Sequence, residues 1–381
     1  MFGRYKNFLL ALSVLVGAIV GAGIFGIPYV VAKSGLVPAL FYFLILGGAI
    51  ILIHLFFGEV VLRTKEKHRL IGYAEKYLGK WGKFFVGISV IVGLSGALLA
   101  YLILGGQFLT IIFSSVFNLS SFHFSLLFWL VLSYFVFRGI KLIAPIELFT
   151  NLFFFLAVFV IFFFCFPKID FSNFIIFDLP NIFLPYGVIL FSLLGLAAIP
   201  EALEVLKIPA EKKGLKKIII LATFLVVILY IFFALGIAGV TGANTSPDAL
   251  SGLVPYLGKG IIFWGALAGV ITLADSFLIL GLSLRNSFIY DFGLPRSLSC
   301  SIALGLPLIL FLAGFRSFIE VIGIVGIVIG MIEGGVVVLL FKKAKELGDR
   351  IPEYSLKVSS VLLYCLIGLF ILGAISQLLK L

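Results

Sequence analysis

The chain has 381 residues, of which 62% are hydrophobic and only 12% are charged, and its mean hydropathy is +1.28. Soluble domains carry about 25% charged residues, so this composition excludes a soluble globular protein. The net charge is +11, and its meaning depends on where the basic residues lie along the chain.

Apolar runs of about 20 residues, the length that spans a bilayer as a helix, predict eleven transmembrane segments. In chain order they are residues 8–32, 36–62, 82–113, 124–138, 146–166, 182–204, 218–240, 260–284, 297–314, 317–341 and 357–379. We therefore expect an all-α membrane protein that forms one transmembrane domain, residues 1–381. The three cysteines and three histidines are scattered, so we expect no disulfide framework, no metal site and no cofactor beyond a coupling ion.

Basic residues alternate between the loops on the two sides of these segments. If the N-terminus is cytoplasmic, the outer side holds few of them, namely Lys33, Lys168, Lys259, Arg316 and Lys380. The positive-inside rule then predicts a cytoplasmic N-terminus and an external C-terminus in a multi-pass protein of the plasma or inner membrane. The positive charge is explained by topology and by contact with the lipid bilayer, so we expect no nucleic-acid partner.

The first segment contains an unusual stretch, Gly17–Pro28, with four glycines and a proline. Glycine weakens a helix and proline breaks it. A broken helix is tolerated in hydrocarbon only where protein or a water-filled cavity shelters the freed backbone. Since unpaired N–H groups at the start of a half-helix attract anions, this segment predicts a binding site built from backbone at its middle.

A second stretch repeats this pattern. Gly23–Pro28 and Gly195–Pro200 both read G-x-x-x-I-P, and each lies in the first span of a five-span unit. Because five is odd, the second unit is inverted relative to the first. The chain therefore predicts a 5+5 inverted repeat, as in many transporters. The first repeat is residues 8–166, the second is residues 182–341, and an extra helix follows at residues 357–379.

These motifs carry a family resemblance. Ala18–Ile24 with Gly26–Tyr29 resembles the opening helix of amino acid/auxin permeases and aromatic amino acid permeases. Phe191–Leu196 with Ala198–Glu201 resembles their broken sixth helix. These families belong to the amino acid–polyamine–organocation superfamily and have the LeuT-type fold. The resemblance implies a secondary active transporter that moves an amino acid by alternating access, coupled to H⁺ or Na⁺, with the substrate at unwound helices 1 and 6.

The resemblance also implies a substrate site. It would place the substrate carboxylate on backbone amides and the ammonium near freed carbonyls, which fits the charges at half-helix ends. The amides are those of Gly21, Ala22 and Gly23; the carbonyls lie near Phe191, Ser192 and Leu194. Tyr101, in the third span, either lines the pocket or bonds a neighbouring helix. One departure is Gly17, which stands where sodium-coupled relatives often have an asparagine, so a side-chain ligand for sodium is absent.

Asp275 lies in the middle of the eighth span, where a carboxylate costs a few kcal/mol and is a functional candidate. Thr272 and Ser276 share its helical face. In the resembled fold this face meets the first helix, so the three side chains and the carbonyls of Ala18 and Ile19 could hold Na⁺. Alternatively, Asp275 takes up a proton, or it is a structural carboxyl that never titrates.

Other functions remain open from the sequence. An ion-independent amino acid exchanger would share all these features. A membrane enzyme needs acid–base or metal groups gathered at one interface, and the outer loops offer only Asp170, Asp178 and Asp248. We therefore expect a transporter and not an enzyme. A channel would give no reason for paired helix breaks.

Overall fold

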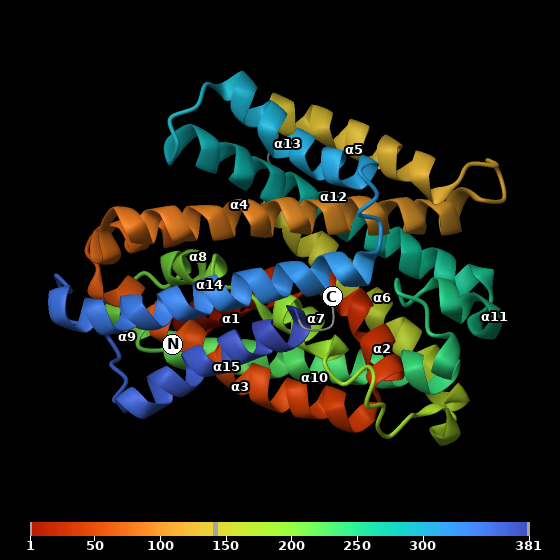
Figure 1. Cartoon of the computed structure of the whole chain (residues 1–381), viewed down its shortest axis with the longest axis horizontal. Coiled ribbons are helices and arrows are strands. Elements are labelled where there is room, and N and C mark those ends of the chain that lie inside the picture. Colours follow the sequence, from red (N-terminus) through yellow and green to blue (C-terminus); the bar gives the residue numbers. More distant parts are fainter. Residues whose placement is uncertain (1, 140–143, 379–381) are drawn as a thin grey trace.

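A computed structural model describes residues 2–139 and 144–378, without the side chains of residues 2–4, 144–148 and 377–378. Within these residues the chain consists of helices and loops and has no strand (Figure 1). The longest helices are α4 (Leu70–Phe113), α12 (Lys259–Tyr290) and α14 (Phe318–Leu347), which extend along the long axis of the molecule. The all-α prediction is confirmed for the described chain.

Eight helical stretches of the described chain are long and apolar enough to cross a membrane, and a bent pair brings the number to nine. The bent pair is α1 (Phe2–Ile19) and α2 (Gly23–Ser34). The remaining major helices are α3 (Leu36–Arg63), α5 (Ser121–Arg138), α6 (Ala144–Cys165), α7 (Leu184–Leu193), α8 (Ala198–Val205) and α10 (Leu215–Thr241). Short helices lie in the connections: η1 (Phe166–Lys168), η2 (Phe171–Asn173), α9 (Pro209–Lys212), η3 (Gly242–Asn244), η4 (Ser251–Leu253) and α11 (Val254–Leu257).

Two further apolar helices, α13 (Arg296–Leu312) and α15 (Ser360–Leu378), coincide with the ninth and eleventh predicted spans. Within the residues described with their side chains they extend over Arg296–Leu312 and Ser360–Ser376, and each is shorter than the stretches that qualify as spans by length. Each of the eleven predicted spans thus contains a helix or a helix pair, although fewer than eleven meet the criterion for crossing a membrane. Residue 379, the last of the predicted extra helix, lies outside the described residues.

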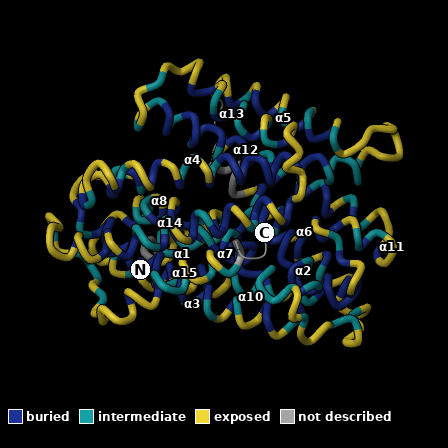
Figure 2. The backbone as a smooth tube through the Cα atoms, viewed as in Figure 1, coloured by how far each residue is buried: buried dark blue, intermediate teal, exposed yellow. Residues whose placement is uncertain are grey.

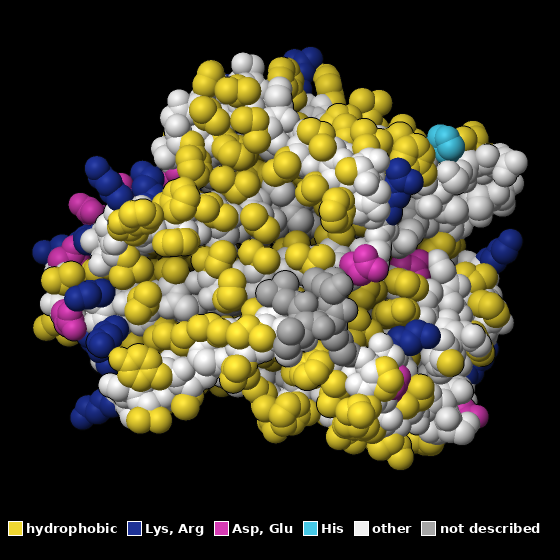
Figure 3. Space-filling view, in the orientation of Figure 1, with side chains coloured by type: hydrophobic (Ala, Val, Ile, Leu, Met, Phe, Trp, Pro, Cys, Tyr) yellow, Lys and Arg dark blue, Asp and Glu magenta, His cyan; other side chains and the backbone are white. Residues whose placement is uncertain are grey.

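The outer faces of the helices are apolar, the reverse of a soluble protein. On α6, Phe149, Phe159 and Phe163 are exposed, while Phe154 and Val158 are buried on the inward face. Buried residues concentrate in the middle of the bundle (Figure 2), and hydrophobic side chains cover most of the visible surface (Figure 3). Such a surface is stable in lipid and would associate in water.

Glycines bring α7 and α14 into backbone contact at the centre of the bundle. A Cβ on Gly326 would lie 2.0 Å from the carbonyl oxygen of Gly187. A Cβ on Gly187 would lie 2.3 Å from the carbonyl oxygen of Gly323. Small residues at such a contact let membrane helices approach closely, so this face of α14 fixes the position of α7.

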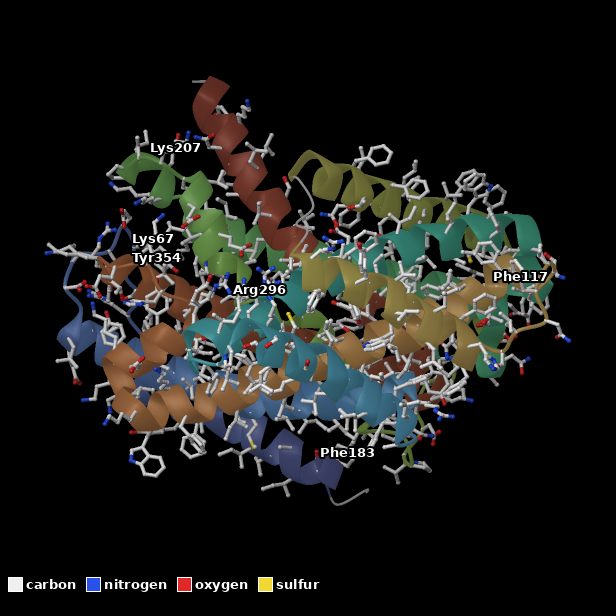
Figure 4. The ribbon with its side chains drawn as sticks, turned by 90° about the horizontal axis from the view of Figure 1, so that it is seen from above. Lys67, Phe117, Phe183, Lys207, Arg296 and Tyr354 are labelled. Carbon is white, nitrogen blue, oxygen red and sulfur yellow. The ribbon has the colours of Figure 1, made fainter. Side chains whose placement is uncertain are left out.

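One end of the bundle is rich in Lys and Arg. The basic residues visible in Figure 3 gather mainly at its left end. Figure 4 shows Lys67, Lys207 and Tyr354 at this end and Phe117 at the opposite end. The end that holds Lys67, Lys207 and Tyr354 is called the basic end below.

Candidate functional site

Two helices of the bundle are interrupted. The first break separates α1 from α2, which are bent by 57° relative to each other. The second break, residues 194–197, separates α7 from α8. Both interruptions predicted from the glycine and proline pattern are confirmed. The prolines do not mark the breaks themselves, because Pro28 lies inside α2 and Pro200 lies in the first turn of α8, where proline is tolerated.

The two breaks lie against each other. A Cβ on Gly23 would lie 2.2 Å from the Oγ of Ser192 and 2.8 Å from its Cα. A Cβ on Gly195 would lie 2.4 Å from the Cγ1 of Ile19. Each break therefore has a glycine where the other break approaches, and a side chain at either position would displace its neighbour.

Three consecutive amides at the first break donate to no backbone carbonyl. Among the described residues these are the amides of Gly21, Ala22 and Gly23, of which that of Gly21 is hydrogen-bonded to the hydroxyl of Tyr230. Backbone bonding resumes when the amides of Ile24 and Phe25 donate to the carbonyls of Gly21 and Ala22, at 3.4 and 3.1 Å. Free N–H groups at the start of a helix carry a partial positive charge. Such N–H groups can together bind a carboxylate.

The second break has the same feature, which the sequence analysis did not identify. Within the described chain, the amides of Gly195, Leu196 and Ala197 donate no hydrogen bond at the start of α8. The carbonyls expected to face an ammonium group are partly engaged. The amide of Leu194 donates to the carbonyl of Phe191 at 3.4 Å, and the carbonyl of Ser192 accepts from Tyr230 at 3.0 Å.

Tyr101 connects the first break to α12. Its hydroxyl lies 3.4 Å from the Cβ position of Gly21, and it is hydrogen-bonded to the side chain of Ser276. Tyr101 is buried, with 6% of its side chain exposed. The contact joins a residue of the predicted substrate site to one of the predicted cation site.

Asp275 lies in a buried polar pocket between α12 and α6. Its Oδ2 accepts a hydrogen bond from the Oγ1 of Thr150 at 3.0 Å. Its Oδ1 and the Oγ1 of Thr272 are buried and have no hydrogen-bond partner among the described residues. Buried polar atoms without partners are rare and require an explanation, and oxygen atoms of this kind can bind a cation or a proton.

The carbonyls of Ala18 and Ile19 were predicted to share a cation site with Asp275. Among the described residues, no hydrogen bond links either carbonyl to the side chains around Asp275. The carbonyl of Ile19 accepts from Tyr230 at 3.0 Å, and Ala18 is exposed. Instead, α6 contacts both α12 and α1. Thr150 is hydrogen-bonded to Asp275 of α12, and the next residue, Asn151, lies against α1. The Nδ2 of Asn151 is 3.0 Å from the Cβ position of Gly17.

An aromatic cluster lies beyond the first break. Phe25, on α2, makes edge-to-face contacts with Phe108, Phe154 and Phe233, at centroid distances of 4.8, 5.8 and 6.3 Å. These rings come from α4, α6 and α10. Because Phe154 is one helical turn from Thr150, the cluster lies one turn along α6 from the hydrogen bond between Thr150 and Asp275.

Two buried polar side chains near the breaks were not predicted as site residues. The hydroxyl of Tyr230, on α10, lies 3.0 Å from the carbonyl oxygens of both Ile19 and Ser192. The second is His54, on α3. It is fully buried beside Gly195, and neither ring nitrogen has a partner among the described residues.

A cavity of about 480 Å³ lies at the basic end, away from the breaks, and is lined by Arg63, residues 348–352 and Ser355. Its charged groups are already paired. Arg63 contacts Glu59 at 2.8 Å, and Arg350 contacts Glu353 at 2.7 Å. The arrangement binds the connection between α14 and α15 to the end of α3.

The broken helices, the apolar surface and the buried central polar groups define a membrane transporter and not an enzyme. The chain belongs to the tryptophan/tyrosine permease family, whose profile matches residues 4–377. It shares its fold with MhsT, a transporter of the LeuT type, in a crystal structure of MhsT in complex with L-phenylalanine. The TM-score is 0.69 at 16% identity, over 98% of each chain. No curated protein sequence matches the chain.

Proposed function

We propose that this protein is a secondary active transporter of an aromatic amino acid, and that the substrate binds where the two helix breaks meet. The observation that carries the proposal is the set of three amides, at Gly21, Ala22 and Gly23, that donate to no backbone carbonyl and lie next to the second break. The amides would hold the substrate carboxylate, and the carbonyls around Phe191, Ser192 and Leu194 would face its ammonium group. Tyr101 would border the same pocket.

The family supports the substrate class. Its name refers to tryptophan and tyrosine, and MhsT was crystallised with L-phenylalanine. Transport would proceed by alternating access around the breaks, within a 5+5 inverted repeat of residues 8–166 and 182–341, with eleven membrane-spanning helices in all. The concentration of Lys and Arg at the basic end supports a cytoplasmic N-terminus and an external C-terminus in the plasma or inner membrane (Figure 3).

Asp275, Thr272 and Ser276 would couple transport to an ion gradient. The unpartnered oxygens of Asp275 and Thr272 support a cation or proton site. Between the two ions, the proton is favoured, because Gly17 supplies no side-chain ligand and the carbonyl of Ile19 is engaged by Tyr230. If the carboxyl does not titrate during the cycle, the protein would work as an ion-independent exchanger.

Uptake into proteoliposomes tests the proposal. The purified protein is given a panel of radiolabelled amino acids while proton and sodium gradients are imposed separately. We expect accumulation of at least one aromatic amino acid, driven by the proton gradient. No uptake of any aromatic amino acid, with uptake of another class, would contradict the proposed substrate.

Asp275→Asn tests the coupling role. This variant should bind the substrate but lose gradient-driven accumulation. Glu333→Gln is the matched control, because Glu333 is another carboxylate within a span and accepts one hydrogen bond, from Ser89 at 3.3 Å. We expect the control to accumulate substrate. Full accumulation by Asp275→Asn would remove Asp275 from coupling.

A further inference from the structure

The hydroxyl of Tyr230 is hydrogen-bonded to the backbone of both interrupted helices. Its Oη lies 3.0 Å from the carbonyl oxygen of Ile19 and 3.0 Å from that of Ser192. Ile19 is the last residue of α1, and Ser192 is next to the last residue of α7. The ring is fully buried in α10, so solvent cannot replace the hydroxyl.

The chemistry of this contact explains why a tyrosine is suited to it. The carbonyl groups at the C-terminal end of a helix carry partial negative charge. Two such ends that approach one point repel each other unless a donor lies between them. The hydroxyl of Tyr230 is that donor, and it is close enough to donate its hydrogen to either carbonyl. Without it, two buried carbonyls would lose a partner together.

The packing of α10 adds a second constraint. This helix packs on α1, α2 and α3, which surround the breaks. It therefore holds the hydroxyl in a fixed place relative to the group of helices that contains both interruptions (Figure 1). A side chain anchored in this way can set the distance between the two breaks.

We propose that Tyr230 is a positioning residue that fixes the two breaks relative to each other. The proposal rests on the proposed function, because amides at one break and carbonyls at the other can bind opposite ends of one amino acid only at a fixed separation. The hydroxyl also occupies the point where the carbonyls of Ile19 and Ser192 would otherwise attract a cation. The substrate ammonium is thereby directed to the carbonyls around Phe191 and Leu194.

Hydrogen exchange of the full-length protein without substrate tests the first part. Tyr230→Phe removes only the hydroxyl, and we expect faster exchange of the hydrogen-bonded amides at both breaks. These are the amides of Val20, Ile24 and Phe25 at the first break and of Leu194, Ala198 and Ile199 at the second. The matched control is Tyr354→Phe, because Tyr354 donates to the carbonyl of Leu55 at 2.7 Å, on α3, and makes no hydrogen bond to either interrupted helix among the described residues. The control should leave exchange at the breaks unchanged. Faster exchange at only one break, or at neither, would overturn the proposal.

Replacement of Tyr230 by p-aminophenylalanine keeps a donor at the same position and tests the hydrogen bond itself. This variant should restore the exchange pattern of the wild type. If it behaves like Tyr230→Phe, or if Tyr230→Phe does not fold and this variant does not restore slow exchange, the proposal is wrong.

Transport kinetics test the second part. We expect Tyr230→Phe to raise KM for the substrate about tenfold and to change kcat little, since the substrate groups are misplaced before any conformational change. Tyr354→Phe should keep the wild-type KM. An unchanged KM in Tyr230→Phe would overturn the positioning role. If the wild type transports no aromatic amino acid, the proposed function fails, whereas the exchange result still decides whether Tyr230 joins the breaks.

Discussion

The two breaks share one backbone feature but differ in their surroundings. At each, three amides donate to no backbone carbonyl where the second half-helix begins. The first break is bent by 57° and is reached by Tyr101 from α4, while Asn151 of α6 lies against the preceding turn of α1. The second is straight enough for Leu184–Val205 to qualify as one apolar span, and the unpartnered His54 lies beside it.

This difference suggests how one kind of interruption can serve two purposes. The first break has polar side chains on several sides, which suits the binding of a charged group. The second is tightly packed on α14, since a Cβ on Gly326 would lie 2.8 Å from the amide nitrogen of Phe191, three residues before the break. We infer that the first break determines recognition of the carboxylate and that the second provides a fixed surface opposite it.

The largest effect is expected from a methyl group between the breaks. Gly23→Ala would place a Cβ 2.8 Å from a backbone atom of Ser192, which cannot move away as a flexible side chain can. Overpacking of this kind costs about 1–3 kcal/mol, so transport should fall at least about tenfold.

Gly195→Ala sharpens the comparison, because its Cβ would meet only the side chain of Ile19 at this distance. It should reduce transport less than Gly23→Ala does. Gly305→Ala is the control, with no atom within 4 Å of its Cβ position. Equal losses for Gly23→Ala and Gly195→Ala, measured as initial uptake rates, would show that the two breaks are not distinguished in this way.

A smaller loss of transport is expected from exchanging the residues at positions 17 and 151, which lie against each other on α1 and α6. Gly17→Asn should impair transport several-fold, because the new side chain would collide with Asn151, whose Nδ2 is 3.0 Å from the Cβ position. The double variant Gly17→Asn/Asn151→Gly should recover part of the activity. Absence of recovery in a double-variant cycle would indicate that the two positions do not share this space.

His54→Leu probes the second break. An unpaired buried polar group costs about 1–3 kcal/mol, so replacing the imidazole by an apolar group should keep or raise Tm by a few degrees and leave uptake intact. Thermal unfolding in detergent and uptake assays measure the two properties. A folded His54→Leu protein without transport would assign the imidazole a functional role instead.

The smallest effect is expected at the basic end, away from both breaks, where a change at Asp349 should alter stability and not transport. Asp349 accepts hydrogen bonds from the side chain of Lys76 at 2.7 Å and from the amide of Lys65 at 2.8 Å. The Lys76 ammonium holds the pKa of the Asp349 carboxyl below its usual range. A lowered pKa in the folded state stabilises the protein above the unfolded pKa, about 4, and this contribution is lost as the pH falls through the folded pKa.

Asp349→Asn should therefore lower stability at pH 7 by less than about 1 kcal/mol, because the pair is partly exposed. The difference from the wild type should shrink as the pH falls below about 4, and transport should be unaffected. Tm measured across this pH range checks the prediction. A difference that grows on acidification would contradict the sign of the shift.

Part of this site could be predicted from the sequence. The breaks were predictable because glycine acts on the local backbone, and Asp275 was predictable because a carboxylate within a span is costly. The partners could not be predicted. Thr150 and Tyr230 are single hydroxyl residues in apolar spans, and their roles depend on which faces of neighbouring helices meet. The free amides at Gly195 follow from the same glycine pattern and could have been inferred.

The central claim is that the two breaks together bind one zwitterion. A cryo-EM structure with the amino acid identified by the uptake panel tests it most directly. We predict density for the ligand with its carboxylate on the amides of Gly21, Ala22 and Gly23 and its ammonium towards the second break. A ligand bound elsewhere, such as in the cavity beside Arg63, with both breaks unoccupied, would contradict the account.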